Sequence, residues 1–445
     1  MQKTFRRYTV AIILLLLTLL TVNGCRNFFA FPLQASQVTF QGPLYVALHE
    51  DLIAHSLEKD LILDFGKTRK IAVNFVSFET MEEASELLQS EDVDLVFTRT
   101  PTKFTHFPNH FSTIYDDLKL AILCSAPLKK SSEIYIPTNY RYVTQAKTFK
   151  RFEQLKQITT TKSNAELRRL ALASEGICYV ADSRVAVRSA DLFPQLKVVW
   201  TASRSESVAW ITRQDLKGLN EIIHSWFQNL VRRKQIRKFW DRYDAVDFKM
   251  TALEHRRFEK DIDKKLSQWR SLFEKHAKKN QIPWTLLAAV AYQESKWSND
   301  AVSFTGVKGL MQLTKITAKQ VGVTDREDPK QSVRGGAFYL KYLYDKTPTD
   351  LLPYERWSLA LSAYNMGWAH LRDARRLAIK LNKDPYRWSQ FKTIVPLLGD
   401  KKYISELSFG TARGAETVDF VDQVLGYTEL LNARFTRRSP TSQDF

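Results

Sequence analysis

The sequence predicts an α/β domain followed by a mainly helical domain. From Thr39 to about Tyr243, short runs rich in β-branched and aromatic residues alternate with helical segments, which is typical of an α/β domain with a mixed or parallel sheet. Beyond Tyr243, apolar residues recur at helical spacing almost to the end of the chain. The length of 445 residues is more than one hydrophobic core usually serves, so two or three domains are expected.

The strands and helices of the first domain can be placed in order. TMEEASELLQSE is predicted to be a helix, because Met81, Ala84, Leu87 and Leu88 fall on one helical face. SNAELRRLALASE is a second helix candidate. The predicted strands are LYVAL, KIAVNFVSF and VDLVFT, followed by KLAILC, EIYI, GICYVADS, KVVWT and SVAWIT.

A long amphipathic helix closes the first domain. Its apolar face consists of Ile222, Ile223, Trp226, Phe227 and Leu230. We place the boundary near Asp244, in the polar stretch DAVDFKM, which gives domains over residues 39–245 and 246–436 and a tail over 437–445. Because no Pro- or Ser-rich linker separates the two domains, we expect them to pack together.

The N-terminus has the composition of an export signal. Basic residues precede the apolar run from Val10 to Val22, which is short for a membrane span and typical of a signal-peptide core. The following VNGC resembles a bacterial lipoprotein cleavage site with Cys25 as the lipidated residue, so we predict a signal peptide over residues 1–24 and a tether over 25–38. Arg26 stands where an aspartate would favour the inner membrane, so this resemblance implies the periplasmic face of the outer membrane. The alternative is an uncleaved signal anchor with an incidental cysteine.

The charge of the chain restricts its partners. The net charge of +18 favours an anionic partner such as a membrane surface or an acidic polymer. The sequence has no arginine-glycine tract, zinc-knuckle spacing or basic heptad, so nucleic acid is not the expected partner. None of the eight histidines has metal-ligand spacing, and we expect no metal and no cofactor.

Two further cysteines lie in strand-like runs. Cys124 ends LAILC and Cys178 lies in GICYV. They could pair in an oxidising compartment. Two cysteines do not reveal their connectivity, however, so we expect buried free thiols.

One glutamate of the helical half lies in an unusual position. Pro283 marks the start of a helix that WTLLAAVAYQES continues, and Leu287, Val290, Ala291 and Glu294 share one face of it. The carboxyl group is therefore among apolar side chains and near the C-terminal end of the helix, where the dipole disfavours an anion. Both effects raise its pKa and suit a proton donor, although a glutamate at a helix end is more often solvated.

The motifs that follow this helix resemble those of a known family. After Glu294 come Ser303, then GVKGLMQLTKITA and later SAYNMG, an order similar to that of the goose-lysozyme-related lytic transglycosylase (SLT) domain. DREDPKQSVRGGAFYL, AHLRDAR and ARGAETVDFV narrow the resemblance to the membrane-bound murein transglycosylases that carry a solute-binding-like front domain. The resemblance covers about Asp247 to Tyr427 well and the front half loosely.

This resemblance implies a fold and a reaction. The fold would be mainly α and lysozyme-like. The reaction would be cleavage of the β-1,4 bond between N-acetylmuramic acid and N-acetylglucosamine in the glycan strands of peptidoglycan. The products would carry 1,6-anhydromuramoyl ends, as expected of a carbon–oxygen lyase that serves cell-wall remodelling and recycling.

The resemblance also implies roles for individual residues. Glu294 would be the single acid/base. Most glycosidases need two carboxylates, but the C6 hydroxyl of the muramoyl residue can replace the second, since it is held within the substrate. Asp300 is the nearest alternative carboxylate, and Glu416 is expected to support the fold. The implied substrate-binding residues are Ser303, Met311, Gln312, Tyr364 and Asn365, of which Asn365 would mainly brace a loop.

The first half resembles the periplasmic solute-binding domains, which hold amino acids between two lobes. The resemblance rests on QSEDVDLVFTRTP, YVADSRVAV and DLFPQLKVVWTASRSESVAWITR. It implies a two-lobed α/β fold and makes Arg99 a candidate for binding the carboxylate of an amino-acid-like ligand or a muropeptide. The alternative is a degenerate domain that binds no small molecule and serves as a scaffold.

Three functions therefore stay open. The first is an active lytic transglycosylase on the outer membrane. The second is a solute or muropeptide sensor whose catalytic domain is weak or silent. The third is a lysozyme-type hydrolase, which differs from the first in using water. Retention of Glu294 together with Ser303, Gln312 and Tyr364 favours an active enzyme.

Overall fold

The computed structural model describes most of the chain after residue 41, and residues Gly42–Phe445 form one compact unit. The described residues are 40, 42–49, 52–78, 81–97, 111–138, 149–162, 164–213, 215–233, 235–236, 239, 247–303 and 306–435. The predicted signal peptide, Cys25, Arg99, the domain boundary near Asp244 and the tail over 437–445 lie outside the described residues.

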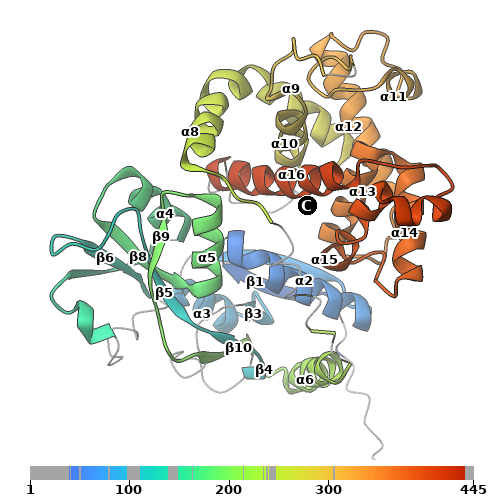
Figure 1. The fold of residues 1–445 in the computed structure, drawn as a ribbon. Coiled ribbons are helices and arrows are strands. Elements are labelled where there is room, and N and C mark those ends of the chain that lie inside the picture. Colours follow the sequence, from blue (N-terminus) through green and yellow to red (C-terminus); the bar gives the residue numbers. More distant parts are fainter. Residues whose placement is uncertain are drawn as a thin grey trace, which may run out of the picture. The chain divides into compact units, whose positions relative to one another are not determined.

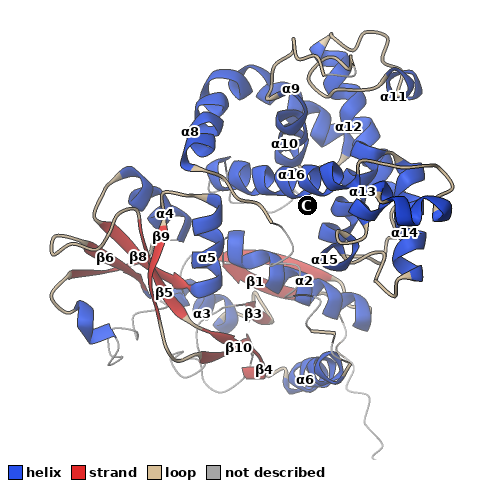
Figure 2. Ribbon diagram, viewed as in Figure 1, coloured by secondary structure: helices blue, strands red, loops and turns tan. Residues whose placement is uncertain are grey.

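The first half contains two mixed sheets with the same strand arrangement. Each sheet has five strands, in the orders β2-β1-β3-β10-β4 and β7-β6-β8-β5-β9 (Figures 1 and 2). In the first sheet β10 is antiparallel to β3, and at the same place in the second sheet β5 is antiparallel to β8. The strands of the first sheet are β1 (Leu44–His49), β2 (Val73–Phe78), β3 (Leu95–Phe97), β4 (Phe111–Leu118) and β10 (Glu206–Thr212). Those of the second are β5 (Leu120–Cys124), β6 (Glu133–Pro137), β7 (Lys156–Thr160), β8 (Ile177–Asp182) and β9 (Lys197–Thr201).

The chain passes between the two sheets twice. It leaves the first sheet at the end of β4 and enters the second at β5 with Lys119 between them, and it returns from β9 to β10. Two sheets of equal topology joined by two crossings form a two-lobed α/β domain, as predicted. The strand predictions were correct except that β4 and β7 were missed. Both are edge strands with polar sequences, so the periodicity of a buried strand is weak in them.

Helices accompany the strands of both sheets (Figure 2). The apolar face predicted for the last helix of this half is confirmed: Ile223, Trp226, Phe227 and Leu230 are buried, with Ile222 half-buried. Trp226 and Phe227 pack with Trp210 of β10 and tie this helix to the first sheet. The helices are α2 (Leu52–Arg69), α3 (Met81–Gln89), α4 (Asn164–Ala173), α5 (Ser183–Leu192) and α6 (Lys217–Arg232), with a 3-10 turn η3 (Phe149–Phe152).

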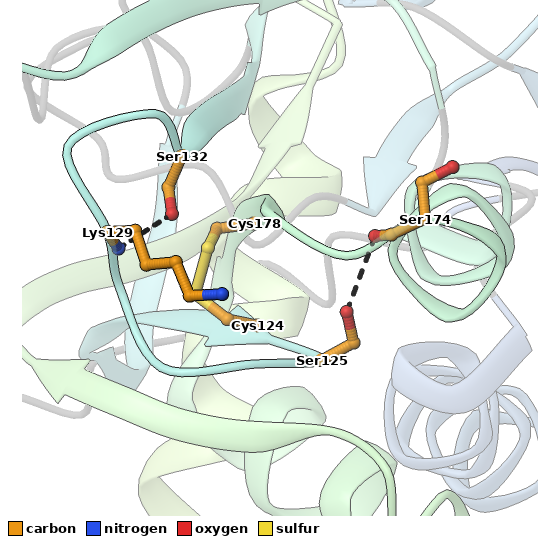
Figure 3. Close-up of a disulfide and its surroundings, with 6 residues drawn as sticks. All are labelled: Cys124, Ser125, Lys129, Ser132, Ser174 and Cys178. Carbon is orange, nitrogen blue, oxygen red and sulfur yellow. Dashed lines mark hydrogen bonds between the residues drawn. A yellow bond between two sulfur atoms is a disulfide. The ribbon is translucent and has the colours of Figure 1, made fainter.

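The prediction of free thiols was wrong. Cys124 of β5 and Cys178 of β8 are directly opposite in the antiparallel pairing and form a disulfide, with their Cα atoms 4.3 Å apart (Figure 3). Nearby, Ser125 Oγ donates a hydrogen bond to the Ser174 carbonyl at 3.4 Å. The two cysteines meet because of the register between two strands that lie far apart in the sequence. The spacing of cysteines along the chain does not predict that register.

The second half is helical and is built around α10 (Trp284–Ser295). Nine of the twelve residues of α10 are buried, because α9 and α16 both pack against it (Figure 1). A mainly helical domain was predicted, and the helix start at Pro283 is confirmed. The other elements are α8 (Ala252–Asp261), a π-helical turn (Ile262–Leu266), α9 (Ser267–Asn280), α11 (Lys315–Gln320), α12 (Pro329–Asp345), α13 (Pro353–Met366), α14 (Trp368–Lys380), α15 (Trp388–Phe391), the 3-10 turns η5 (Val395–Gly399) and η6 (Lys401–Glu406), and α16 (Gly414–Phe435).

The two halves pack together, as expected from the absence of a linker. The Arg188 guanidinium of α5 is nine-tenths buried and donates two hydrogen bonds to the Glu429 carboxylate of α16, at 2.9 and 2.8 Å. Phe193 packs edge-on against His255 of α8. Among the described residues, no helix is long and apolar enough to cross a membrane.

Candidate active site

Glu294 lies in the last turn of α10. The helix ends at Ser295, and the next two residues, Lys296 and Trp297, have left-handed backbone angles with φ of 52° and 55°. The Trp297 indole is buried and donates a 2.8 Å hydrogen bond to the Ala288 carbonyl, which fixes this reversal of the chain. Glu294 therefore has a rigid support, and its side chain is half-buried on a face whose other residues are fully buried.

The surroundings of Glu294 favour its protonated form. Burial raises the pKa of the Glu294 carboxyl to about 8, and the charge of Lys296 opposes this rise without cancelling it. Lys296 is more exposed, but desolvation still lowers the pKa of its ammonium to about 8. At neutral pH, Glu294 thus carries a proton that it can donate, as predicted from its place on the helix.

The segment after the helix folds back as a tight loop. We call residues 300–303 and 306–313 the glycine loop. It contains short antiparallel bridges in which Lys308 pairs with both Val302 and Leu313. Within it, Ser303 Oγ accepts a 3.0 Å hydrogen bond from the Val307 N–H. The Gln312 amide donates to the Ala301 and Gly309 carbonyls at 3.0 and 2.9 Å. Both donors of Gln312 are thus used inside the loop, and Oε1 is the atom that a substrate donor would meet.

Three hydroxyl groups attach the glycine loop to the surrounding helices. Ser295 Oγ lies 3.0 Å from the Leu310 carbonyl oxygen, and Ser332 Oγ of α12 accepts a 3.2 Å hydrogen bond from the Met311 N–H. The Tyr364 hydroxyl of α13 donates a 2.9 Å hydrogen bond to the Met311 carbonyl. The backbone at Met311 is therefore held from two sides and tied to the helix that carries Glu294.

Tyr364 is also an electrostatic neighbour of Glu294. Burial raises the pKa of the Tyr364 hydroxyl well above its ordinary value, and the charges of Glu294 and Tyr339 add to the effect. The ring of Phe420 lies nearly parallel to that of Tyr364, with centroids 6.3 Å apart. Since the hydroxyl donates to Met311, its oxygen lone pairs are the part that can accept a hydrogen bond from another donor.

The structure differs from the expectation for Met311. Its side chain is fully buried and packs on Gly336, where an added Cβ would come within 2.7 Å of two Met311 atoms. Its contribution is therefore to hold the loop rather than to contact sugar. Gly336 of α12 leaves room for the Met311 side chain, and the adjacent Gly335 leaves room for Leu313 of the same loop.

The remaining predicted residues lie around this centre. Asn365 is exposed, and its Oδ1 accepts a 2.7 Å hydrogen bond from Thr417 of α16, which agrees with a bracing role and leaves the amide NH₂ for substrate. Asp300 is exposed. Glu416 is also exposed and pairs with Arg413 at 3.1 Å, so Thr417 rather than Glu416 links α16 to the site.

Sequence reasoning missed Ser295, Ser332 and Tyr339. Each acts through a contact between elements that are distant in sequence, and a lone serine or tyrosine gives no local signal of such a contact. Ser295 could have been suspected, because a buried serine in the last turn of a helix needs a hydrogen-bond acceptor. Among the aromatic residues near these motifs, Trp297 and Tyr292 are buried in the core, whereas Trp368 is half-buried.

The site has the parts of a glycan-cleaving enzyme: a protonated, half-buried acid beside a loop with exposed polar groups. A family model described as "Transglycosylase SLT domain" matches residues 271–386, which include Glu294, the glycine loop and Tyr364. This match places the helical half of the chain in the class of proteins that contain a transglycosylase SLT domain.

The relatives make the assignment more specific. The "Membrane-bound lytic murein transglycosylase F" of Maricaulis maris is 32% identical over 429 residues, which cover 89% of this chain and 90% of that protein. The protein of the same name from Yersinia pseudotuberculosis is 30% identical over 422 residues, with 88% and 85% covered. The chain belongs to the membrane-bound lytic murein transglycosylase F family.

Some alignments within this family are shorter. The relative of the same name from Desulfosudis oleivorans is 34% identical over 255 residues, and this alignment covers 57% of the chain and 56% of that protein. The chain thus matches just over half the length of that relative.

Solved structures of solute-binding proteins align with about half of the chain. An ancestral arginine-binding protein bound to glutamine covers 46% of the chain at 17% identity, with a TM-score of 0.39. A periplasmic arginine-binding protein from Legionella pneumophila covers 46% at 12% identity, with a TM-score of 0.39. These scores are low, and the two-lobed description of the front half follows from the strand order of its sheets.

Proposed function

We propose that this protein cleaves the β-1,4 bond between N-acetylmuramic acid and N-acetylglucosamine in peptidoglycan and leaves 1,6-anhydromuramoyl ends. The observation that carries the proposal is the half-buried carboxyl group of Glu294, whose pKa of about 8 makes it a proton donor at neutral pH. It stands in a chain that belongs to a family of lytic murein transglycosylases. The reaction class is a carbon–oxygen lyase.

In the first step, Glu294 donates its proton to the leaving glycosidic oxygen as the bond to the muramoyl C1 breaks. The C6 hydroxyl of the same sugar then bonds to C1 and gives its proton to the Glu294 carboxylate. The acid is thereby restored, and no water is consumed. One carboxyl group is sufficient because the attacking hydroxyl is already held within the substrate.

Neighbouring groups position the acid and the sugar. The Tyr364 hydroxyl donates its own proton to the Met311 carbonyl, and its oxygen is proposed to accept a hydrogen bond from protonated Glu294 and so to orient the acid. Ser303 and Gln312 Oε1 are proposed to bind the sugar beside the scissile bond, and the Asn365 amide is proposed to reach the glycan strand from the end of α13. The glycine loop then acts as a fixed wall of the site, since both of its faces are tied to helices.

We further propose that the mature chain is lipidated at Cys25 and held on the periplasmic face of the outer membrane. The VNGC sequence and the word "membrane-bound" in the name of the relatives support this proposal. We also propose that the front half binds an amino-acid-like ligand or a muropeptide with the help of Arg99. This proposal rests on the two-lobed fold.

The test is mass spectrometry of the products that the full chain releases from purified murein. Anhydro-muropeptides from the wild-type chain and none from Glu294→Gln would support both the reaction and the role of Glu294. Products with reducing ends, one water heavier, would indicate a hydrolase instead. Absence of cleavage by the wild-type chain would favour a sensor with a silent catalytic half.

A further inference from the structure

A row of aromatic rings leads away from Glu294 along α12. The Tyr364 and Tyr339 rings have centroids 5.7 Å apart, and Tyr339 is followed by Tyr342 at 6.3 Å with nearly parallel rings. All three tyrosines are half-buried, so part of each residue is exposed to solvent. The row begins beside the acid, because Tyr364 is the tyrosine whose pKa responds to the charge of Glu294.

A lysine stands at the far end of this row. The Lys346 ammonium lies 4.5 Å from the centroid of the Tyr342 ring and 5.1 Å from that of Trp368, the first residue of α14. From Tyr339 to Lys346, α12 rises by about 10 Å. A cation is therefore held between two aromatic faces, within the reach of a substituent on a sugar that occupies the row.

Lys346 is exposed. Within the part of the chain that the structure describes, its ammonium forms no ion pair with a carboxylate. The neighbouring cations Lys341 and Arg356 differ from Lys346 because both already have partners within the protein. Lys341 of the same helix pairs with Asp345 at 2.6 Å, and Arg356, which lies over Tyr344, donates to the Thr347 hydroxyl and the Tyr344 carbonyl at 2.9 and 3.1 Å.

From this geometry we propose that Lys346 is a specificity-determining residue that binds a carboxylate on the peptide attached to the glycan strand. The inference rests on the proposed function. The rings of Tyr339, Tyr342 and Trp368 contact the apolar faces of the sugars. The ammonium of Lys346 binds the charged group of the peptide that projects from these sugars. Two rings hold the ammonium in place, which lowers the entropy lost when the anion binds.

The test compares Lys346→Ala and Lys346→Arg with a matched control, Lys341→Ala, in the full chain. The control removes a lysine of the same helix that already has an acidic partner. Three substrates are used: soluble peptide-bearing glycan fragments, the same fragments with their carboxylates capped as methylamides, and glycan freed of its peptides. The peptide-free glycan still carries the lactyl carboxylate of the sugar. It therefore shows whether Lys346 binds that carboxylate or one on the peptide.

We expect Lys346→Ala to lower kcat/KM about three- to tenfold on the peptide-bearing fragments, mainly through KM. On capped fragments and on peptide-free glycan, Lys346→Ala should match the wild-type chain, and Lys346→Arg should restore most of the loss. Lys341→Ala should cleave all three substrates at the wild-type rate. An equal loss on all three substrates, no loss on any, or a loss confined to peptide-free glycan would each overturn the inference.

A binding measurement separates this inference from the proposed function. Calorimetry of peptide-bearing and methylamide-capped fragments with Glu294→Gln, and with Glu294→Gln combined with Lys346→Ala, needs no turnover. If the wild-type chain cleaves nothing, the proposed function fails. The Lys346 inference then stands if Lys346→Ala weakens binding of the uncapped fragments alone, and it fails if the two proteins bind them equally.

Discussion

The hydroxyl oxygen of Ser295 lies 3.0 Å from the carbonyl oxygen of Leu310 and 2.9 Å from that of Ala291. One side chain thus joins the last turn of α10 to the glycine loop, one residue after Glu294. The distance between the acid and the loop is set by this contact together with the Tyr364–Met311 hydrogen bond.

Replacement of Ser295 by alanine should therefore affect catalysis more than stability. Loss of the buried hydroxyl is expected to cost about 1–2 kcal/mol of unfolding free energy and to lower kcat several-fold, because the loop is no longer fixed to α10. Urea unfolding and murein digestion would measure the two effects. Ser358→Ala is the matched control, since Ser358 is also buried but its hydroxyl donates to the Tyr354 carbonyl of its own helix. Equal losses of activity in the two variants would contradict the assigned role.

The pH dependence of cleavage should show the ionisation of Glu294. Because Glu294 acts first as an acid and its pKa is about 8, kcat/KM should decline above about pH 8. The positive charge of Lys296 lowers this pKa, so Lys296→Met should move the decline to higher pH. Lys308→Met is the control: it removes a lysine that is paired with Glu327, and the decline in kcat/KM should stay at the same pH. A decline that stays unchanged in Lys296→Met would show that another group is titrating.

The same ionisation should appear in stability. The Glu294 pKa is raised from 4.5 to about 8 in the folded state, so its contribution to stability is fully present below pH 4.5 and is lost as the pH rises through 8. Glutamine does not ionise. Between pH 5 and pH 8.5, the unfolding free energy of Glu294→Gln should therefore rise by about 2 kcal/mol relative to that of the wild-type chain. One pKa unit corresponds to about 1.4 kcal/mol, and partial solvation of the site reduces the full effect. Thermal unfolding at several pH values measures the difference, which should be smallest below pH 4.5 and largest above pH 8.

Gly309 should tolerate no side chain. It has a φ of 85°, and an added Cβ would lie 2.0 Å from the Arg326 carbonyl oxygen, which belongs to the backbone and cannot rotate away. Gly309→Ala should lower the unfolding free energy by about 3 kcal/mol or more and abolish cleavage. Gly322 also has a positive φ, 67°, but open space around it, so Gly322→Ala should cost only about 1 kcal/mol. Similar losses in the two variants would contradict the close approach.

Reduction of the disulfide should weaken the second lobe. The bond between Cys124 and Cys178 closes a loop with a sequence separation of 54, for which a stabilisation of about 2–4 kcal/mol is expected. Dithiothreitol should therefore lower the urea midpoint of the wild-type chain. The double variant Cys124→Ser with Cys178→Ser should start at the lower midpoint and show no response to dithiothreitol. A wild-type midpoint that does not respond would contradict a stabilising bond.

Local patterns in the sequence predicted much of the fold and the central residue of the site. The period of α10 placed Glu294 on a buried face, and Pro283 marked where that helix begins. What sequence reasoning lacked were contacts between distant elements. The edge strands β4 and β7, the pairing of Cys124 with Cys178 and the bridge from Ser295 to Leu310 all depend on which segments become neighbours. Local periodicity carries no information about such neighbours.

The two crossings between the lobes have a consequence for biogenesis. The second sheet consists of strands that follow one another from β5 to β9, so its parts are all available once Thr201 has been made. In the first sheet, β4 pairs with β10, which begins at Glu206. The lobe that is synthesised first must therefore wait, with β4 unpaired, until the later lobe is complete. A factor that protects exposed strands would be needed most in that interval.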